Sequence, residues 1–184
     1  MPAPLPTRQQ AVQTLLDCYA GYFDITPAPP AEAPLVAEMA FHANSSQYVL
    51  SKKAVLWQAG SHEYAYLFSV PHLTEEILSD CVALTKARGL PLVKPGPNHM
   101  YTYLTALFLC DTCDPAAKKA LKRCRCYKSF RLSYWGWMDL HTALAECSTG
   151  KTASNASGRG AAQTLAEVLF HRKPLFKRKE RTYL

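Results

Sequence analysis

Six side chains in the sequence are candidates for acid–base or metal chemistry, because imidazole and carboxylate groups can transfer protons and bind cations. They are His42, His62, Glu63, His99, Asp139 and His141. In a strand, Asp139 and His141 would share one face, since they are two residues apart. The chain has no HExxH, HxH or GxSxG spacing, so a site built from Glu63, His99, Asp139 and His141 would have to be assembled by the fold. The sequence therefore favours a protein that is not an enzyme.

A phosphate-binding loop is a second chemistry to consider, because residues 145–152 (AECSTGKT) satisfy a relaxed form of that motif. In such loops the backbone amides wrap the phosphates, and a helix begins at once so that its amino end faces the negative charge. Here residues 153–160 (ASNASGRG) follow, and these are typical of a turn. We therefore expect a polar loop over 148–158, with no nucleotide site and no cofactor.

Four cysteines form two pairs whose spacing is similar to that of zinc ligands. They are Cys110 and Cys113, then Cys124 and Cys126. Tetrahedral zinc sites use paired cysteines of this kind. Neither pair is followed by a glycine-rich turn, and cysteine is also common in buried positions. We predict that these thiols pack in the core and bind no metal.

The composition is that of a globular chain, with 184 residues, 48% hydrophobic and 19% charged. One domain with a sizeable core is expected at this length. No apolar run approaches the ~20 residues of a membrane span, and the first residues lack the pattern of a signal peptide. Seven cysteines, an odd number, indicate free thiols in a reducing compartment. We predict a cytoplasmic protein with no membrane partner.

Positive charge is concentrated in two segments of a chain whose formal net charge is +7. Residues 118–131 and 172–181 are rich in lysine and arginine, whereas the rest of the chain is acidic overall. Basic segments of this kind bind phosphate groups or acidic proteins. The predicted contact residues are Lys118, Lys119, Lys122, Arg123, Arg125, Tyr127, Arg131, Lys177, Arg178 and Lys179.

Hydrophobic periodicity predicts the elements that would position these residues. A spacing of three and four, with helix caps, predicts helices over 8–22, 74–88 and 160–171 and a short basic helix that begins at Asp114. A spacing of two predicts strands over 35–42, 48–58, 62–70, 123–135 and 137–147. Residues 100–110 are apolar on both faces, which predicts a central strand covered on both sides.

These elements predict an α+β fold: a single domain with a mixed, mostly antiparallel sheet of about six strands and with N-terminal, middle and C-terminal helices. The domain is expected to span residues 8–171, with a proline-rich linker at 26–34 inside it. We expect residues 1–7 to be disordered and residues 172–184 to form a basic C-terminal tail.

The predicted order of helix, three strands, helix and strand is similar to that of the restriction-endonuclease core. That activity needs an acidic residue on the second strand and an Asp/Glu-x-Lys triplet on the third, to hold magnesium and activate water. The predicted second strand, 48–58, has no acidic residue. On the third, Glu63 is followed by Tyr64 and Ala65, so the lysine is missing and we expect no nuclease activity.

We predict a non-enzymatic binding protein that contacts nucleic acid or another acidic partner through its basic segments. In a strand over 123–135, Arg125, Tyr127 and Arg131 would share one face, and basic groups beside an aromatic ring suit phosphate contact and base stacking. Two alternatives remain open. They are an enzyme or metal-dependent protein that uses Glu63, His99, Asp139 and His141, and a small-molecule sensor lined by Tyr64, Tyr66, Tyr101 and Tyr103.

Several segments resemble an uncharacterised family of small cytoplasmic proteins from Gram-positive anaerobic bacteria, a domain of unknown function. They are residues 15–25, 44–56, 62–64, 98–103 and 128–139. The similarity covers most of residues 8–160 and implies one cytoplasmic domain over nearly the whole chain. Because the family has no known activity, the resemblance implies no functional residues.

Overall fold

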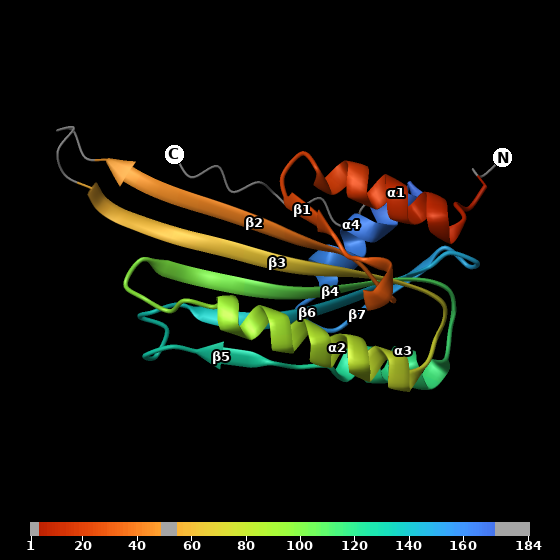
Figure 1. The fold of residues 1–184 in the computed structure, drawn as a ribbon. Coiled ribbons are helices and arrows are strands. Elements are labelled where there is room, and N and C mark those ends of the chain that lie inside the picture. The colour runs from red at the N-terminus through yellow and green to blue at the C-terminus, as the bar shows by residue number, and fades with distance from the viewer. Residues whose placement is uncertain (1–3, 49–54, 172–184) are drawn as a thin grey trace.

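The computed structural model describes the backbone of residues 4–48 and 55–171 and the side chains of residues 4–41 and 60–171. A seven-stranded sheet forms its middle layer, and helices cover both faces of the sheet (Figure 1). The helices are α1 (Arg8–Tyr19), α2 (Glu75–Gly89), α3 (Pro115–Arg123) and α4 (Arg159–Phe170), with two short 3-10 helices, η1 (Pro30–Glu32) and η2 (Leu90–Leu92). The strands are β1 (Asp24–Pro27), β2 (Leu35–Tyr48), β3 (Val55–Leu73), β4 (His99–Cys113), β5 (Tyr127–Ser129), β6 (Trp137–Glu146) and β7 (Lys151–Ser154).

The strands follow the order β1-β2-β3-β4-β6-β5, and β7 pairs with the carboxyl-terminal part of β6. The pairs β3–β4 and β4–β6 are parallel, and the other pairs are antiparallel. Each parallel pair needs a crossover connection, and α2 and α3 lie in these two connections. The chain therefore has the predicted α+β fold, a single domain with a mixed and mostly antiparallel sheet.

Two apolar cores lie on opposite faces of the sheet, and β4 contributes to both. Leu104 and Phe108 pack with α2 and α3, whereas Leu107 and Leu109 pack with α1 and α4. Successive residues of a strand point to opposite faces, so a strand that is apolar throughout must be covered on both sides. The prediction of a covered central strand over 100–110 is confirmed.

The helices begin at residues whose side chains or rings favour a helix start. Thr7 and Gln10 form a capping box at α1, in which each side chain accepts a hydrogen bond from the other's amide. Thr74 accepts a hydrogen bond from the Ile77 amide at the start of α2, and Pro115 opens α3. Within the described residues, no helix is long and apolar enough to cross a bilayer.

The long hairpin of β2 and β3 differs from the predicted strands over 35–42, 48–58 and 62–70. β2 continues without a break to Tyr48, and β3 continues through residues 59–61, where a turn was expected. Residues 37–47 of β2 all have partners on β3, and β4 pairs with β3 from Gly60 onward. Backbone pairing with β3 outweighs the local turn preference of Asn44, Ser45 and Ser46.

The observed strand order changes the comparison with the restriction-endonuclease core, because β1 precedes β2 and the second strand therefore carries an acidic residue, Glu38. Glu38 lies opposite Tyr66, whereas Glu63 lies opposite Phe41. Residues 63 and 66 are three apart on β3, so the two carboxylates point to opposite faces of the sheet. Glu38 instead forms an ion pair with Arg88 on α2. The fold therefore does not bring these two acidic side chains together.

Three further boundaries differ from the predictions. The strand predicted over 123–135 is wrong, since α3 extends to Arg123 and only Tyr127–Ser129 forms β5. Residues 131–133 have positive φ angles, so the chain turns there instead of alternating between two faces. The linker predicted at 26–34 contains the end of β1 and η1, and the loop predicted at 148–158 contains β7.

Candidate functional site

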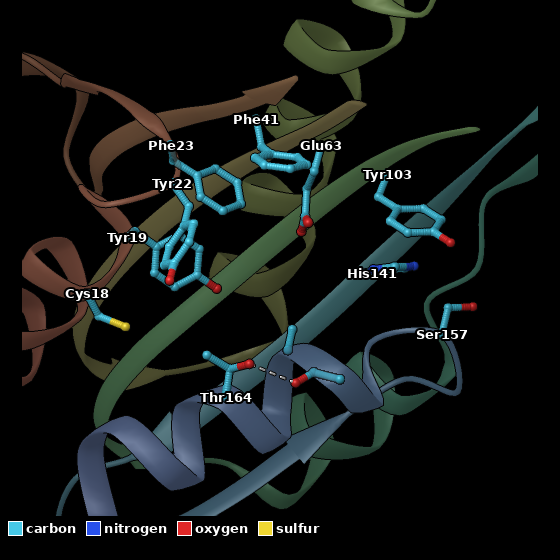
Figure 2. A pocket seen from close by; sticks show the side chains of 12 residues that line it. Cys18, Tyr19, Tyr22, Phe23, Phe41, Glu63, Tyr103, His141, Ser157 and Thr164 are labelled. Atoms are coloured by element: carbon cyan, nitrogen blue, oxygen red, sulfur yellow. Dashed lines mark hydrogen bonds between the residues drawn. The ribbon is translucent and has the colours of Figure 1, made fainter. Parts of the chain in front are cut away.

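A pocket of about 740 Å³ opens between α1, α4 and the sheet (Figure 2). It is lined by Cys18, Tyr19, Tyr22, Phe23, Phe41, Glu63, Tyr103, His141, Ser157, Gly160, Ala161 and Thr164. Pockets that bind small molecules usually measure roughly 300–1,000 Å³ and have mostly apolar and aromatic walls. By size and lining, this pocket is the candidate functional site.

Four neighbouring strands supply the floor of the pocket, because alternate residues on each strand point to the same face. Phe41 on β2 lies opposite Glu63 on β3, and Glu63 lies opposite Tyr103 on β4. On β6, His141 lies opposite Thr105 of β4. These positions are on the face that α1 and α4 cover.

Aromatic rings, some of them from these strands, line two sides of the pocket. On one side α1 ends at Tyr19, and the turn that follows carries Tyr22 and Phe23 to the pocket (Figure 2). The centroid of the Phe23 ring lies 4.8 Å from that of Tyr19 and 5.5 Å from that of Phe41. The wall is therefore continuous from α1 to the sheet.

The second wall consists of Tyr103 and His141, whose ring centroids are 4.3 Å apart. The row of rings continues along the sheet beyond the pocket. Tyr101 stacks on Tyr103 with a centroid distance of 4.4 Å, and Trp137 lies 5.8 Å from Tyr101. Flat ring faces of this kind bind planar or alkyl groups through dispersion and loss of apolar surface.

Glu63 is the acidic side chain of the lining, and no lysine or arginine from the described part of the chain lines the pocket with it. Its carboxylate points into the space between the two walls (Figure 2). It accepts a hydrogen bond of 2.6 Å from Thr105 Oγ1, and no salt bridge joins it to another described side chain. Burial raises the pKa of Glu63, and the hydrogen bond from Thr105 opposes this only in part.

Burial also shifts the two ionisable rings around Glu63. It raises the pKa of Tyr19, and the negative charge of Glu63 adds to this shift. It lowers the pKa of His141, although the charge of Asp139 acts in the opposite direction. Both rings are therefore neutral at pH 7, and Glu63 sets the electrostatic character of the pocket.

Two groups capable of acid–base chemistry, Glu63 and His141, line the pocket. Covalent or acid–base catalysis needs a nucleophile and a base within hydrogen-bond reach of each other. Among the described residues, Glu63 and His141 share no hydrogen bond. No group of three metal-ligating side chains occurs in the described part of the chain either.

The structure separates the acid–base residues singled out in the sequence. Glu63 and His141 meet in the pocket. Asp139 is two residues before His141 in the sequence. It lines a smaller hollow of about 200 Å³, together with Arg125 and Tyr127. The pocket therefore contains two members of the predicted set of four.

His99, the fourth member, has a structural role. Its ring nitrogens lie 2.8 Å from the Trp135 carbonyl oxygen and 2.8 Å from Thr102 Oγ1. Its ring stacks on that of His62, and both residues line a different hollow of about 320 Å³. The side chain of His42 lies outside the described side chains.

The sheet divides the four tyrosines of the predicted sensor. Tyr64 and Tyr66 lie on the face of α2, where they line a hollow of about 160 Å³. Tyr101 and Tyr103 lie on the face of α1 and α4, and of the four only Tyr103 lines the large pocket. Residues two apart share a face, but the face itself depends on how each strand enters the sheet.

The predicted basic residues are distributed over several elements. Lys118 on α3 forms an ion pair of 2.9 Å with Glu146 at the end of β6, so its charge is balanced within the protein. Lys119 and Lys122 are exposed on α3, which packs on the face opposite the pocket. The basic helix therefore does not lie beside the stacked rings.

The remaining basic residues lie around β5. Arg123 and Arg125 are exposed, and Tyr127 is 61% exposed. The guanidinium of Arg131 lies 4.0 Å from the centroid of the Trp135 ring. The other predicted contacts, Lys177, Arg178 and Lys179, lie outside the described residues.

Sequence reasoning missed the contributions of α1 and α4 to the site. The sequence predicts a helix over 8–22, but α1 ends at Tyr19, and Tyr22 in the turn after it is 77% exposed. One signal in the sequence could have identified this part of the site. Three aromatic residues gather at the end of this helix, although aliphatic residues would pack there equally well. Ser157 and Thr164 carried no such signal.

The protein was compared with known proteins at the level of families, curated sequences and solved structures. No curated protein and no solved structure matches it. One family model, described as Domain of unknown function (DUF8052), matches residues 7–167, a span that includes every residue of the pocket lining. This agrees with the predicted resemblance to an uncharacterised domain. The chain belongs to the family described as Domain of unknown function (DUF8052).

Proposed function

We propose that the protein is a non-enzymatic binding protein that holds a small organic molecule in the pocket between α1, α4 and the sheet. The observation that carries this proposal is a cavity of about 740 Å³ in which half of the lining residues carry rings. Apolar walls with a few convergent polar groups are typical of ligand pockets. The proposal joins two alternatives from the sequence, because Tyr103 of the tyrosine set meets Glu63 and His141 of the acid–base set here.

A bulky side chain inside the pocket should abolish this binding. Ala161 lies in the first turn of α4 and in the lining, so Ala161→Trp would fill part of the cavity with an indole ring. In an NMR titration with p-cresol, a neutral aromatic probe, we expect saturable amide shifts around the pocket and an affinity loss of at least about tenfold in this variant.

The matched control is Ala116→Trp, which places the same ring on the exposed surface of α3. This variant should bind p-cresol as the native protein does. Equal binding by all three proteins, or no saturable binding by the native protein, would contradict the pocket proposal.

A second candidate function, contact with nucleic acid, is favoured by the edge strand β5. Tyr127 is 61% exposed there, and its strand partner Asp139 lies on the face that carries the stacked rings. Arg125 is exposed two residues before it. Ring faces with flanking arginines are what proteins use to hold unpaired strands. We propose this edge as the surface that an acidic partner would contact.

Binding of an oligothymidine at this edge should weaken with salt, with a log–log slope of about −0.7 per phosphate contact. Arg125→Glu should weaken it several-fold, and Tyr127→Ala should affect single strands more than duplex, because stacking needs an unpaired base. Lys119→Glu makes the same change of charge on α3, away from β5, and is the control. Equal losses in the two charge variants would contradict a site at β5.

We further propose that the protein acts in the cytoplasm of a bacterium, as the family resemblance implies. Its seven cysteines are all free thiols in the structure, and three of them are buried. Unpaired thiols in this number are typical of a reducing compartment.

A further inference from the structure

The pocket combines aromatic walls with one partly buried carboxylate, and we propose that its ligand is an organic cation whose ammonium group lies beside Glu63. This inference rests on the proposed function, because it names the ligand class of the same pocket. Two independent features of the lining support it, the balance of charge and the arrangement of the rings.

Charge balance is the first feature. Among the described residues, the lining contains one carboxylate and no lysine or arginine. A carboxylate that is partly removed from water is costly unless a counter-charge accompanies it. Thr105 supplies a hydrogen bond to Glu63 but no charge. A cationic ligand would provide the missing counter-charge, whereas a neutral ring would leave the carboxylate unpaired.

The rings around Glu63 are the second feature. An aromatic ring has a negative face, which attracts a cation that lies within about 6 Å of its centroid. The wall of Tyr19, Phe23 and Phe41 lies on one side of the Glu63 carboxylate, and Tyr103 lies on the other (Figure 2). An alkylated ammonium group between them would contact ring faces while its charge stays close to the carboxylate. Aromatic cages hold quaternary ammonium ligands in this way.

The amino end of α4 bounds the pocket across from Glu63 (Figure 2). Gly160 and Ala161 in its first turn are part of the lining. The helix dipole favours an electron-rich group at this end. The ligand would therefore carry its cationic group at Glu63 and a hydroxyl or other acceptor toward α4.

Choline and 3,3-dimethyl-1-butanol separate charge from shape. The two molecules have the same outline and hydroxyl group, but a carbon replaces the charged nitrogen in the second. In NMR or calorimetric titrations of the full chain, we expect choline to bind at least about tenfold more tightly than its neutral isostere. Glu63→Gln should reduce this preference by at least about threefold, and a smaller preference should persist because the ring faces still attract the cation.

The affinity for choline should also rise with pH as Glu63 loses its proton, whereas that for the isostere should stay constant. The other titratable groups in the described lining are Cys18 and Tyr19 on α1, Tyr22 in the turn after it, Tyr103 on β4 and His141 on β6. His141→Gln is the control for this experiment. It should preserve the pH dependence, because the proposed counter-charge is Glu63 and not the imidazole.

The variant Glu63→Gln is expected to fold, since Gln can still accept the hydrogen bond from Thr105. Burial raises the pKa of Glu63, so the folded protein binds this proton more tightly than the unfolded chain, and its stability falls as the pH rises through that range. The variant lacks this penalty. Its melting temperature should equal the native value at acidic pH and lie at or above it at mildly alkaline pH.

The outcomes distinguish this inference from the proposal on which it rests. If both probes bind equally and Ala161→Trp prevents both from binding, the proposal of a cationic ligand is wrong and the pocket remains a binding site. If neither probe nor p-cresol binds to the native protein, both proposals are wrong. A choline preference of the same size in Glu63→Gln as in the native protein would also contradict the role of the carboxylate.

Discussion

Asn155→Ala should lower the free energy of unfolding by about 3–5 kcal/mol, the largest effect that we expect from a single substitution. The side chain of Asn155 is buried and makes four hydrogen bonds to backbone groups. Its Oδ1 accepts from the amides of Thr142 and Gly158, at 3.1 and 2.7 Å. Its Nδ2 donates to the carbonyl oxygens of Cys124 and Leu140, at 3.0 and 2.8 Å.

These four bonds join β6 to the end of α3 and to the start of α4. The alanine variant would leave four backbone groups without their partner, and each unsatisfied buried group costs roughly 1–3 kcal/mol. Water that enters the space can satisfy some of these groups, so the expected loss in the free energy of unfolding is smaller than the sum of the four costs. Because α4 bounds the pocket, we also expect the variant to lose binding of p-cresol.

Urea unfolding followed by circular dichroism measures this effect. Asn155→Asp keeps both acceptor bonds but loses the two donor bonds and adds a buried charge, so it should also be strongly destabilised. Asn98→Ala, at an exposed loop position, is the matched control and should change stability by less than about 0.5 kcal/mol. A loss below about 1 kcal/mol in Asn155→Ala would show that the four bonds do not hold these elements together.

Lys118→Ala should destabilise the protein by about 2–3 kcal/mol, because it leaves Glu146 buried without its counter-charge. The two groups are 2.9 Å apart, and their side chains are 30% and 11% exposed. Burial alone would raise the pKa of Glu146, but the hydrogen bond and the charge of Lys118 outweigh it and hold this pKa below its ordinary value. The partial exposure of Lys118 keeps the expected loss below that of a fully buried pair.

The loss in Lys118→Ala should depend on pH. The pKa of Glu146 is lower in the folded protein than in the unfolded chain, so the pair contributes stability above the unfolded pKa and loses it as the pH falls through the folded pKa. Melting temperatures of native protein and variant should therefore converge at acidic pH. Lys119→Ala, on the exposed side of the same helix, should have little effect at any pH. Equal losses in the two lysine variants would contradict the role of the pair.

The candidate site could be predicted from the sequence only in part. Glu63 and His141 were identified as candidate groups from their chemistry, and the pocket contains both. Asp139 and His99 have the same chemistry but lie elsewhere. The pairing of β3, β4 and β6 decides this difference, because the register sets which residues are neighbours across the sheet.

The sequence by itself determined the helix starts, the two-sided central strand and the α+β class. The threonine caps and Pro115 act through contacts with nearby residues, and the apolar run over 100–110 acts through burial of its own strand. Such preferences are visible in a short stretch of sequence. Only the tertiary structure decided that β2 passes through residues 44–46 and that residues 130–135 turn back. At residues 44–46, pairing with β3 outweighs the local turn preference, whereas local backbone hydrogen bonds hold the turn over 130–135. The pairing of β2, β3 and β4 also places Phe41, Glu63 and Tyr103 side by side beneath α1 and α4.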